Sequence, residues 1–415
     1  MARARSLVDA LSPGARVFVP SMAGESALLL AEVEARPEAA RGVTFVSVQF
    51  PGIGRADWLG VHPEARQVAY FMSEPVRSGL RAGRAELRGL DYPGIFRDLR
   101  DGPPADVAFA QVSPPGPDGQ CGAGLCNDFL PAVWARAGRR VVHVNPRLPR
   151  TGGSFRIRLE EVDAWVEAEA EVLVYETPPP TQVEERIGVH VARLVRDGDT
   201  IQFGIGAVPR AVAGALAGHR RLRVHSGFAS DPVQVLWDSG ALDRDAPIVT
   251  GQGLGTAAFR AFVEECGRFE LRDVSHTHDV ATVGGIERFV AVNSAIQVDL
   301  LGQVNAEAVD GALHAGAGGL PAFAAGALRS PGGRSLVCLP STARRGSVSR
   351  VVPVLDGGAL CSVPRYLADV FVTEHGVAEV RGLGLDARAR AIIGLAAPEH
   401  RPALEAAWEE RRKRL

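Results

Sequence analysis

The sequence predicts an α/β fold built from two tandem open α/β domains of similar topology. Three observations predict it: strand-like apolar runs alternate with helical segments, glycine-rich loops follow several of the runs, and one strand, loop and helix pattern occurs twice, 184 residues apart. Alternation of this kind is typical of mostly parallel sheets covered by helices. In open sheets of this class ligands bind at the carboxyl ends of the strands, so we expect the glycine loops in a cleft between the two halves.

The repeated pattern begins at residues 13–20 in the first half and at residues 197–204 in the second. Each copy reads as a tight turn, a short apolar strand, a small-residue loop and a helix. A second pair of strands, residues 107–110 and 290–293, has an offset of about 183 residues. A weaker pair joins residues 43–50 and 222–226. The agreement of these spacings favours a duplicated α/β unit.

The remaining elements follow from apolar runs and helical periodicity. The predicted strands are residues 107–112, 141–144, 171–175, 201–203, 289–292 and 336–339, and the predicted helices include residues 129–137 and 189–195. The proline-rich segment 177–181 cannot continue a helix or a central strand, which makes it the natural linker. A chain of 415 residues is long enough for two to three domains, and we expect one domain over residues 1–185 and another over residues 186–415.

Composition excludes several classes of protein. The net charge is −2, which disfavours a nucleic-acid partner, and no apolar run reaches the ~18 residues of a membrane span. Because Lys413 is the single lysine, a buried Schiff-base lysine and a Walker A lysine are excluded. The five cysteines lack the paired spacing of a zinc site. We therefore expect a cytoplasmic protein with reduced thiols, no metal, no nucleic acid and no membrane partner, and leave a homo-oligomer open.

Six sequence blocks occur in an order that resembles the acetyl-CoA hydrolase/transferase family. They are DVAFAQVSPP (106–115), VNPRLPRT (144–151), FGIGAVP (203–209), NSAIQVDLLGQVN (293–305), PSTA (340–343) and VTEHGVA (372–378). The resemblance runs from about residue 13 to residue 400 and implies two class I CoA-transferase-like domains. It also implies that CoA moves between a small acyl-CoA and a carboxylic acid, with the CoA thioester as substrate and no permanently bound cofactor.

The expected CoA-binding residues are glycines in strand-to-helix loops and two asparagines. A Gly-x-Gly turn between a strand and a helix brings backbone N–H groups close to a phosphate or a thioester oxygen. In the family, the stretch equivalent to residues 316–319 lines the CoA site. The candidates are Gly204, Gly206, Gly302, Gly318, Gly319, Asn293 and Asn305. The two asparagines either hold the acyl carbonyl or pantetheine amides, or make hydrogen bonds in the core.

The family's mechanism uses a glutamate nucleophile in a His-Ser-Glu or His-Thr-Glu context, but this chain reads His225-Ser226-Gly227. Glycine supplies no nucleophile, and three interpretations stay open. Another carboxylate takes over the covalent step, the candidates being Glu25 and Glu64 on loops of the first half. Alternatively water attacks the thioester, which makes the protein an acyl-CoA hydrolase. In the third interpretation the protein binds acyl-CoA without turning it over.

Overall fold

The computed structural model describes residues 2–153, 155–355 and 358–415. The chain forms two compact units. Unit 1 comprises residues 1–176, 248–277 and 314–316, and unit 2 comprises residues 177–247, 278–313 and 317–415. The first change of unit falls at the proline-rich segment, while the domain boundary at residue 185 stays a prediction. In the part of the chain that the structure describes, no helix combines the length and apolar character that a membrane crossing needs.

Unit 1 is built on a parallel sheet of eight strands in the order β1-β11-β8-β6-β2-β3-β4-β5. All six residues of β6 are buried, as expected of a central strand covered on both faces. The bounds in that order are Ala2–Arg3, Ala164–Glu167, Arg139–Val144, Val107–Val112, Arg16–Phe18, Thr44–Ser47, Arg66–Ala69 and Ala85–Leu87.

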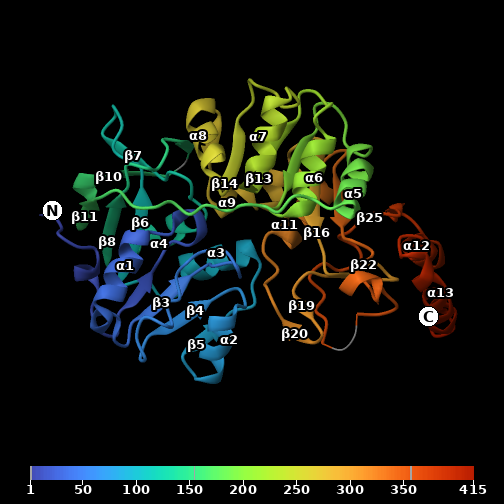
Figure 1. Ribbon diagram of the computed structural model, residues 1–415, viewed down its shortest axis with the longest axis horizontal. Helices are drawn as coiled ribbons and strands as arrows, with labels where there is room; N and C mark the ends of the chain where they lie inside the picture. Colours follow the sequence, from blue (N-terminus) through green and yellow to red (C-terminus); the bar gives the residue numbers. More distant parts are fainter. Residues whose placement is uncertain (1, 154, 356–357) are drawn as a thin grey trace. The chain divides into compact units, whose positions relative to one another are not determined.

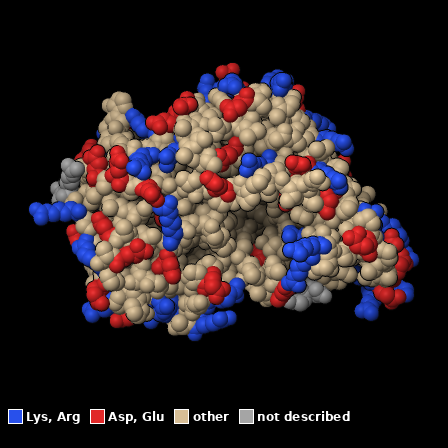
Figure 2. Space-filling model, in the orientation of Figure 1, with Lys and Arg blue, Asp and Glu red and all other residues tan. Residues whose placement is uncertain are grey.

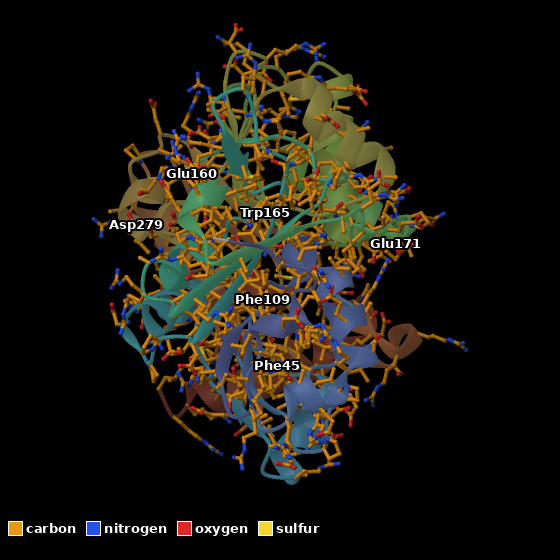
Figure 3. All side chains as sticks on the ribbon, turned by 90° about the vertical axis from the view of Figure 1, so that its left-hand side faces the viewer. Phe45, Phe109, Glu160, Trp165, Glu171 and Asp279 are labelled. Atoms are coloured by element: carbon orange, nitrogen blue, oxygen red, sulfur yellow. The ribbon has the colours of Figure 1, made fainter. Side chains whose placement is uncertain are left out.

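Several helices of unit 1 begin at side-chain caps, and its core combines aliphatic side chains with a few aromatic ones. The Ser26 hydroxyl accepts a hydrogen bond from Leu29 N at 3.1 Å and starts α1 (Ala27–Ala35). Phe45 on β3 and Phe109 on β6 lie within the unit, whereas Glu171 points outward (Figure 3). The other helices and short strands are α2 (Glu74–Arg81), α3 (Tyr92–Asp101), α4 (Leu130–Trp134), α8 (Ala257–Cys266), α9 (Val274–Thr277), the antiparallel pair β7 (Gln120–Gly122) and β10 (Arg156–Arg158), and the parallel ladder β14 (Ile248–Gly253), β15 (Phe269–Leu271) and β9 (Gly152–Gly153).

Unit 2 has a second sheet in which β25, β21, β16, β12 and β13 are parallel neighbours and β26 is antiparallel to β25. In that order they span Val370–Thr373, Arg334–Cys338, Phe289–Ser294, Thr200–Phe203, Arg223–Ala229 and Gly376–Glu379. Helices α5, α6 and α7 pack side by side (Figure 1). The helices are α5 (Gln182–Ala192), α6 (Ala207–Ala215), α7 (Asp231–Asp238), α10 (Val280–Gly284), α11 (Leu320–Arg329), α12 (Leu385–Ile393) and α13 (Arg401–Arg412), and the short strands are β17 (Gln297–Asp299), β18 (Val304–Asn305), β19 (Ala308–Val309), β20 (Ala312–Leu313), β22 (Thr342–Ala343), β23 (Val348–Ser349) and β24 (Val351–Val352).

The two sheets have the same strand order, which confirms the similar topology predicted from the repeats. Unit 1 runs β11-β8-β6-β2-β3, and unit 2 runs β25-β21-β16-β12-β13. The repeated segments 13–20 and 197–204 supply β2 and β12, which occupy equivalent places.

The face drawn in Figure 2 carries acidic and basic side chains interspersed rather than one basic patch.

Three predicted elements are wrong in detail. Residues 171–175 form no strand, and the strand of this region is β11 at Ala164–Glu167. The predicted helix 129–137 is limited to α4, Leu130–Trp134. The predicted helix 189–195 begins earlier, as α5 at Gln182, because Thr181 and Glu184 form a capping box directly after the prolines.

Candidate active site

The glycines of the first predicted loop lie at the carboxyl edge of the unit 2 sheet. Gly204 follows β12 directly, and Gly206 is the N-cap of α6 with a φ of 119°, a value that favours glycine. On the neighbouring strand β16, Asn293 exchanges amide hydrogen bonds with Gln202 at 3.2 and 3.4 Å. The structure therefore brings Gly204, Gly206 and Asn293 to one edge, beside the N-terminus of a helix.

Gly227 lies on β13, the strand beside β12, and it faces the ring of His278. A Cβ atom placed on Gly227 would lie 2.8 Å from both Cε1 and Nε2 of His278, closer than atoms of this kind pack. A Cβ on Gly319, the N-cap of α11, would lie 2.5 Å from the same Nε2. The imidazole thus fills the space where side chains at residues 227 and 319 would begin.

Burial keeps the His278 imidazole neutral. Its side chain is 1% exposed, and its ring centroid lies 4.5 Å from that of Phe323 on α11. Desolvation, together with the nearby His225, lowers the pKa of His278 to about 3. Position 227 of this chain therefore holds neither a carboxylate nor room for one, and a neutral imidazole stands beside it.

The other predicted CoA-binding residues of unit 2 lie in a turn, on a short strand and just before α11. Gly302 has a φ of 86° and its N–H donates to Asp299 O at 2.9 Å, so that donor is used within the turn. Asn305 is fully buried and makes four hydrogen bonds to residues 297–308, among them one from its amide to Ala308 O at 2.8 Å. Gly318 is buried with a φ of 59° just before Gly319. A CoA-binding role for these residues stays a prediction.

The two predicted nucleophiles lie in unit 1 in different surroundings. Glu25 follows β2 and is 5% exposed; its carboxylate accepts backbone hydrogen bonds from Arg55 N at 2.9 and 3.0 Å and from Ala56 N at 3.2 Å. Desolvation raises the pKa of Glu25 despite these bonds. Glu64 is exposed, and its N–H donates to His62 Nδ1 at 3.1 Å. A catalytic role for either residue stays a prediction.

A buried carboxyl group that sequence reasoning missed lies in the loop before α4. Asp128 is 1% exposed, and burial raises its pKa to about 7, with Asp273 adding to the effect while a hydrogen bond from Gln252 opposes it. Oδ1 of Asp128 has no hydrogen-bond partner among the residues that the structure describes. The sequence offers no motif around Asp128, because its partner Gln252 lies 124 residues away in the chain.

Other polar groups singled out by the resemblance hold loops together. The Glu374 carboxylate accepts hydrogen bonds from Ser341 N at 2.8 Å and Ser341 Oγ at 2.6 Å, which ties two of the six sequence blocks to each other. Over residues 2–153, 155–355 and 358–415, no group of three or more His, Cys, Asp or Glu side chains is arranged to hold a metal ion.

Replacing Asp128 by asparagine is expected to stabilise the protein at pH 8. An unfolded aspartate loses its proton near pH 4, but the folded Asp128 does so near pH 7. Folding therefore takes up a proton between these values, and the free energy of unfolding falls as pH rises through that window. We expect Asp128→Asn to raise it at pH 8 by about 1–4 kcal/mol and to change it little at pH 4. Urea unfolding at both pH values measures this difference, and a loss of stability at pH 8 would contradict it.

Domain models of one family match both halves of the chain, and one relative matches almost its whole length. The model of the acetyl-CoA hydrolase/transferase N-terminal domain matches residues 1–175, and that of the C-terminal domain matches residues 255–408. The chain is 33% identical over 417 residues to the 4-hydroxybutyrate coenzyme A transferase of Clostridium kluyveri, covering 98% of this chain and 97% of that protein.

A solved CoA-transferase structure is similar to this chain along its whole length, whereas an acetyl-CoA hydrolase is less similar in sequence. The crystal structure of 4-hydroxybutyrate CoA-transferase from Porphyromonas gingivalis matches with a TM-score of 0.81 at 29% identity, covering 100% of this chain and 98% of that chain. An acetyl-CoA hydrolase of Eremothecium gossypii is more distant, at 24% identity over 84% of this chain and 76% of that protein. With both halves matched by their domain models and the two sheets in the same strand order, the chain belongs to the acetyl-CoA hydrolase/transferase family.

Proposed function

We propose that this protein transfers CoA between a small acyl-CoA and a free carboxylic acid. The observation that carries the proposal is the match over 98% of the chain to a CoA transferase at 33% identity, against 24% for the hydrolase. The free thiols of Cys121, Cys126, Cys338 and Cys361 fit the reducing cytoplasm that we propose as its compartment. The proposed enzyme uses the CoA thioester as a substrate and holds no permanent cofactor.

Two helix N-termini of unit 2 support the proposed CoA site. Gly204 and Gly206 lead into α6, and Gly318 and Gly319 lead into α11. Unpaired backbone N–H groups at such ends attract phosphates and developing oxyanions. Asn293 offers an amide at the same sheet edge as Gly204. We assign these five residues to the phosphates, the pantetheine amides and the thioester oxygen of bound acyl-CoA.

The covalent step needs a carboxylate from a residue other than Gly227. In the proposed reaction a carboxylate attacks the thioester, receives the acyl group as an anhydride and then takes back CoA as a thioester. Glu25 and Glu64 are the carboxylates proposed from sequence. The glycine at residue 227 favours a second candidate function, hydrolysis of the acyl-CoA by water, because it supplies no nucleophile of its own.

A substrate panel distinguishes the two functions. Purified protein is incubated with acetyl-, propionyl-, butyryl- and succinyl-CoA, with and without acetate, while new thioesters are followed by mass spectrometry and free thiol by a colour reagent. We expect a new acyl-CoA only when acceptor acid is present, because the proposed reaction conserves the thioester. Thiol release without acceptor would instead establish the hydrolase, and tight CoA binding without either product would contradict both enzymes.

Gly204→Val is expected to weaken CoA binding at least tenfold. A Cβ atom placed on Gly204 would meet no atom of a non-adjacent residue within 4 Å, and its φ is not positive, so valine fits the folded chain but covers the backbone N–H groups at the start of α6. Gly206 is a poorer choice, since its φ of 119° would strain any other residue. Gly218→Val, also free of neighbours within 4 Å, serves as the control. Calorimetric titration with CoA measures the change, and equal affinities would remove this loop from the site.

Restoring a carboxylate at residue 227 is expected to require the removal of His278. Gly227→Glu alone forces a Cβ to 2.8 Å from the imidazole, and overpacking of this kind costs about 1–3 kcal/mol or more. Gly227→Glu combined with His278→Ala relieves the clash. We expect the double variant to form a borohydride-sensitive glutamyl thioester at residue 227, and the single variant to form none. Labelling of both variants alike would show that the ring leaves room for a side chain.

A further inference from the structure

A hollow opens at the amino edge of the unit 2 sheet, the edge opposite the proposed CoA site. Its volume is about 300 Å³, at the lower end of the range of small-molecule sites. Its lining comes from the starts of four neighbouring parallel strands, β12, β16, β21 and β25, and from the end of β26. Because β16 has six residues and is about 20 Å long, this hollow is well separated from the carboxyl edge.

Four arginines and three carboxylates line the hollow. The arginines are Arg196, Arg288, Arg334 and Arg381, and the carboxylates are those of Asp199, Asp369 and Glu379. The lining thus carries more positive than negative charge, which attracts anions. Guanidinium groups bind carboxylates through paired, parallel hydrogen bonds.

Arg288 is held in place at the start of β16. Its Nε lies 3.4 Å from Oδ1 of Asp199, which is 3% exposed, and its Nη2 donates to Gly198 O at 3.2 Å. Its backbone N–H donates to Pro331 O at 2.8 Å, and its φ of 52° lies in a region that residues with a side chain seldom adopt. The Arg288 side chain is still 41% exposed, which leaves part of it open to the hollow.

Arg381 is held in the same way beside β25. It forms an ion pair with the buried Asp369, whose Oδ1 accepts a hydrogen bond from Ser335 N at 2.8 Å, and its Nη2 also donates to Gly333 O at 3.4 Å. Its side chain is 57% exposed. Among the residues that the structure describes, Nη1 of Arg381 and Nη1 of Arg288 have no acceptor. Both groups therefore keep donors for a ligand, and their positions are fixed before it binds.

Arg196 and Arg334 supply the remaining positive charge. Arg196 is exposed, and its side chain makes no ion pair with the described residues. Arg334 lies 3.7 Å from Glu379, whose side chain is 62% exposed, so that pair is weak. Burial raises the pKa of Asp199, while the charges of Arg288, Arg196 and Arg334 oppose the shift. Three of the four arginines are therefore close to one buried carboxylate.

The volume and the spacing of the strands indicate the size of the ligand. At ~30 Å³ for each water molecule, the hollow holds at least about ten waters, so a molecule of about eight to ten non-hydrogen atoms fits. Neighbouring strands lie about 4.8 Å apart, which puts the starts of β16 and β25 about 10 Å from each other. A short carbon chain with an anionic group at each end spans this distance, and Leu194, Val290 and Val370 give the hollow an apolar lining for its middle.

We propose that this hollow is a second binding site, for a free dicarboxylate of about four to six carbons. One carboxylate is bound by Arg288 together with Arg196, and the other by Arg381 together with Arg334. The carboxylates already in the lining disfavour the concentrated charge of a phosphate, whereas a dicarboxylate carries one charge at each end. The inference does not depend on the proposed transfer of CoA.

Calorimetric titration of the full-length protein without CoA tests the site, at a salt concentration of about 0.15 M, which screens weak surface attraction. Succinate and glutarate are compared with butyrate and inorganic phosphate. We expect at least one dicarboxylate to bind about tenfold or more tightly than butyrate and phosphate, because only a dicarboxylate reaches both pairs of arginines. The same dicarboxylate should raise the melting temperature, because it binds only the folded protein.

Two variants locate the binding. Arg196→Gln and Arg334→Gln should each weaken it about tenfold, since each removes charged hydrogen bonds, and both leave Asp199 and Asp369 with their arginine partners. Arg412→Gln is the matched control, because it removes one charge and one exposed ion pair from α13 outside the hollow, and it should bind like the wild-type protein.

Three results would overturn the inference. They are no binding of either dicarboxylate, phosphate binding as tightly as the better dicarboxylate, and equal affinities of the wild-type protein, Arg196→Gln and Arg334→Gln. An equal loss of affinity in Arg412→Gln would also overturn it, because binding would then follow the net charge rather than the hollow. Urea unfolding curves establish that each variant is folded. None of these results bears on the transfer of CoA, which the substrate panel tests separately.

Discussion

The contact between the His278 ring and two glycines determines what the carboxyl edge of unit 2 can do. A Cβ atom on Gly227 would lie 2.8 Å from Nε2 of His278, and a Cβ atom on Gly319 would lie 2.5 Å from the same nitrogen. The ring therefore requires glycine on β13 and glycine at the start of α11. The ring fills the space where a side chain at residue 319 would begin, and glycine at residue 227 supplies no carboxylate.

Unit 1 buries the carboxyl group of Asp128 at a cost in stability. Asp128 is held by Gln252 and the backbone of Val274, yet one oxygen stays without a partner in the described structure and burial favours the protonated form. Natural proteins keep destabilising groups of this kind where activity needs them.

Much of the fold follows from local sequence, because parallel strands buried on both faces read as continuous apolar runs. Residues 107–112 are β6 as predicted, and the repeat at 13–20 and 197–204 identified equivalent strands of both sheets. The strand predicted at residues 171–175 is wrong, because the backbone of this apolar run does not join the strand ladder of the sheet. In the site, the glycine positions around α6 were visible as a strand, turn and helix pattern. The contact of Gly227 with His278 and the pairing of Asp128 with Gln252 join distant residues through tertiary packing, which a single sequence does not encode locally.

The central claim is that the His278 ring fills the space beside residue 227. A double-mutant cycle on stability tests this claim most directly. The free energy of unfolding is measured for the wild-type protein, Gly227→Ala, His278→Ala and the combined variant. The account predicts that alanine at residue 227 destabilises the wild-type protein by about 1–3 kcal/mol, since its methyl group meets the ring, and costs nothing once the ring is removed. Equal costs of Gly227→Ala in both backgrounds would contradict the account and would show that the ring and residue 227 do not compete for one space.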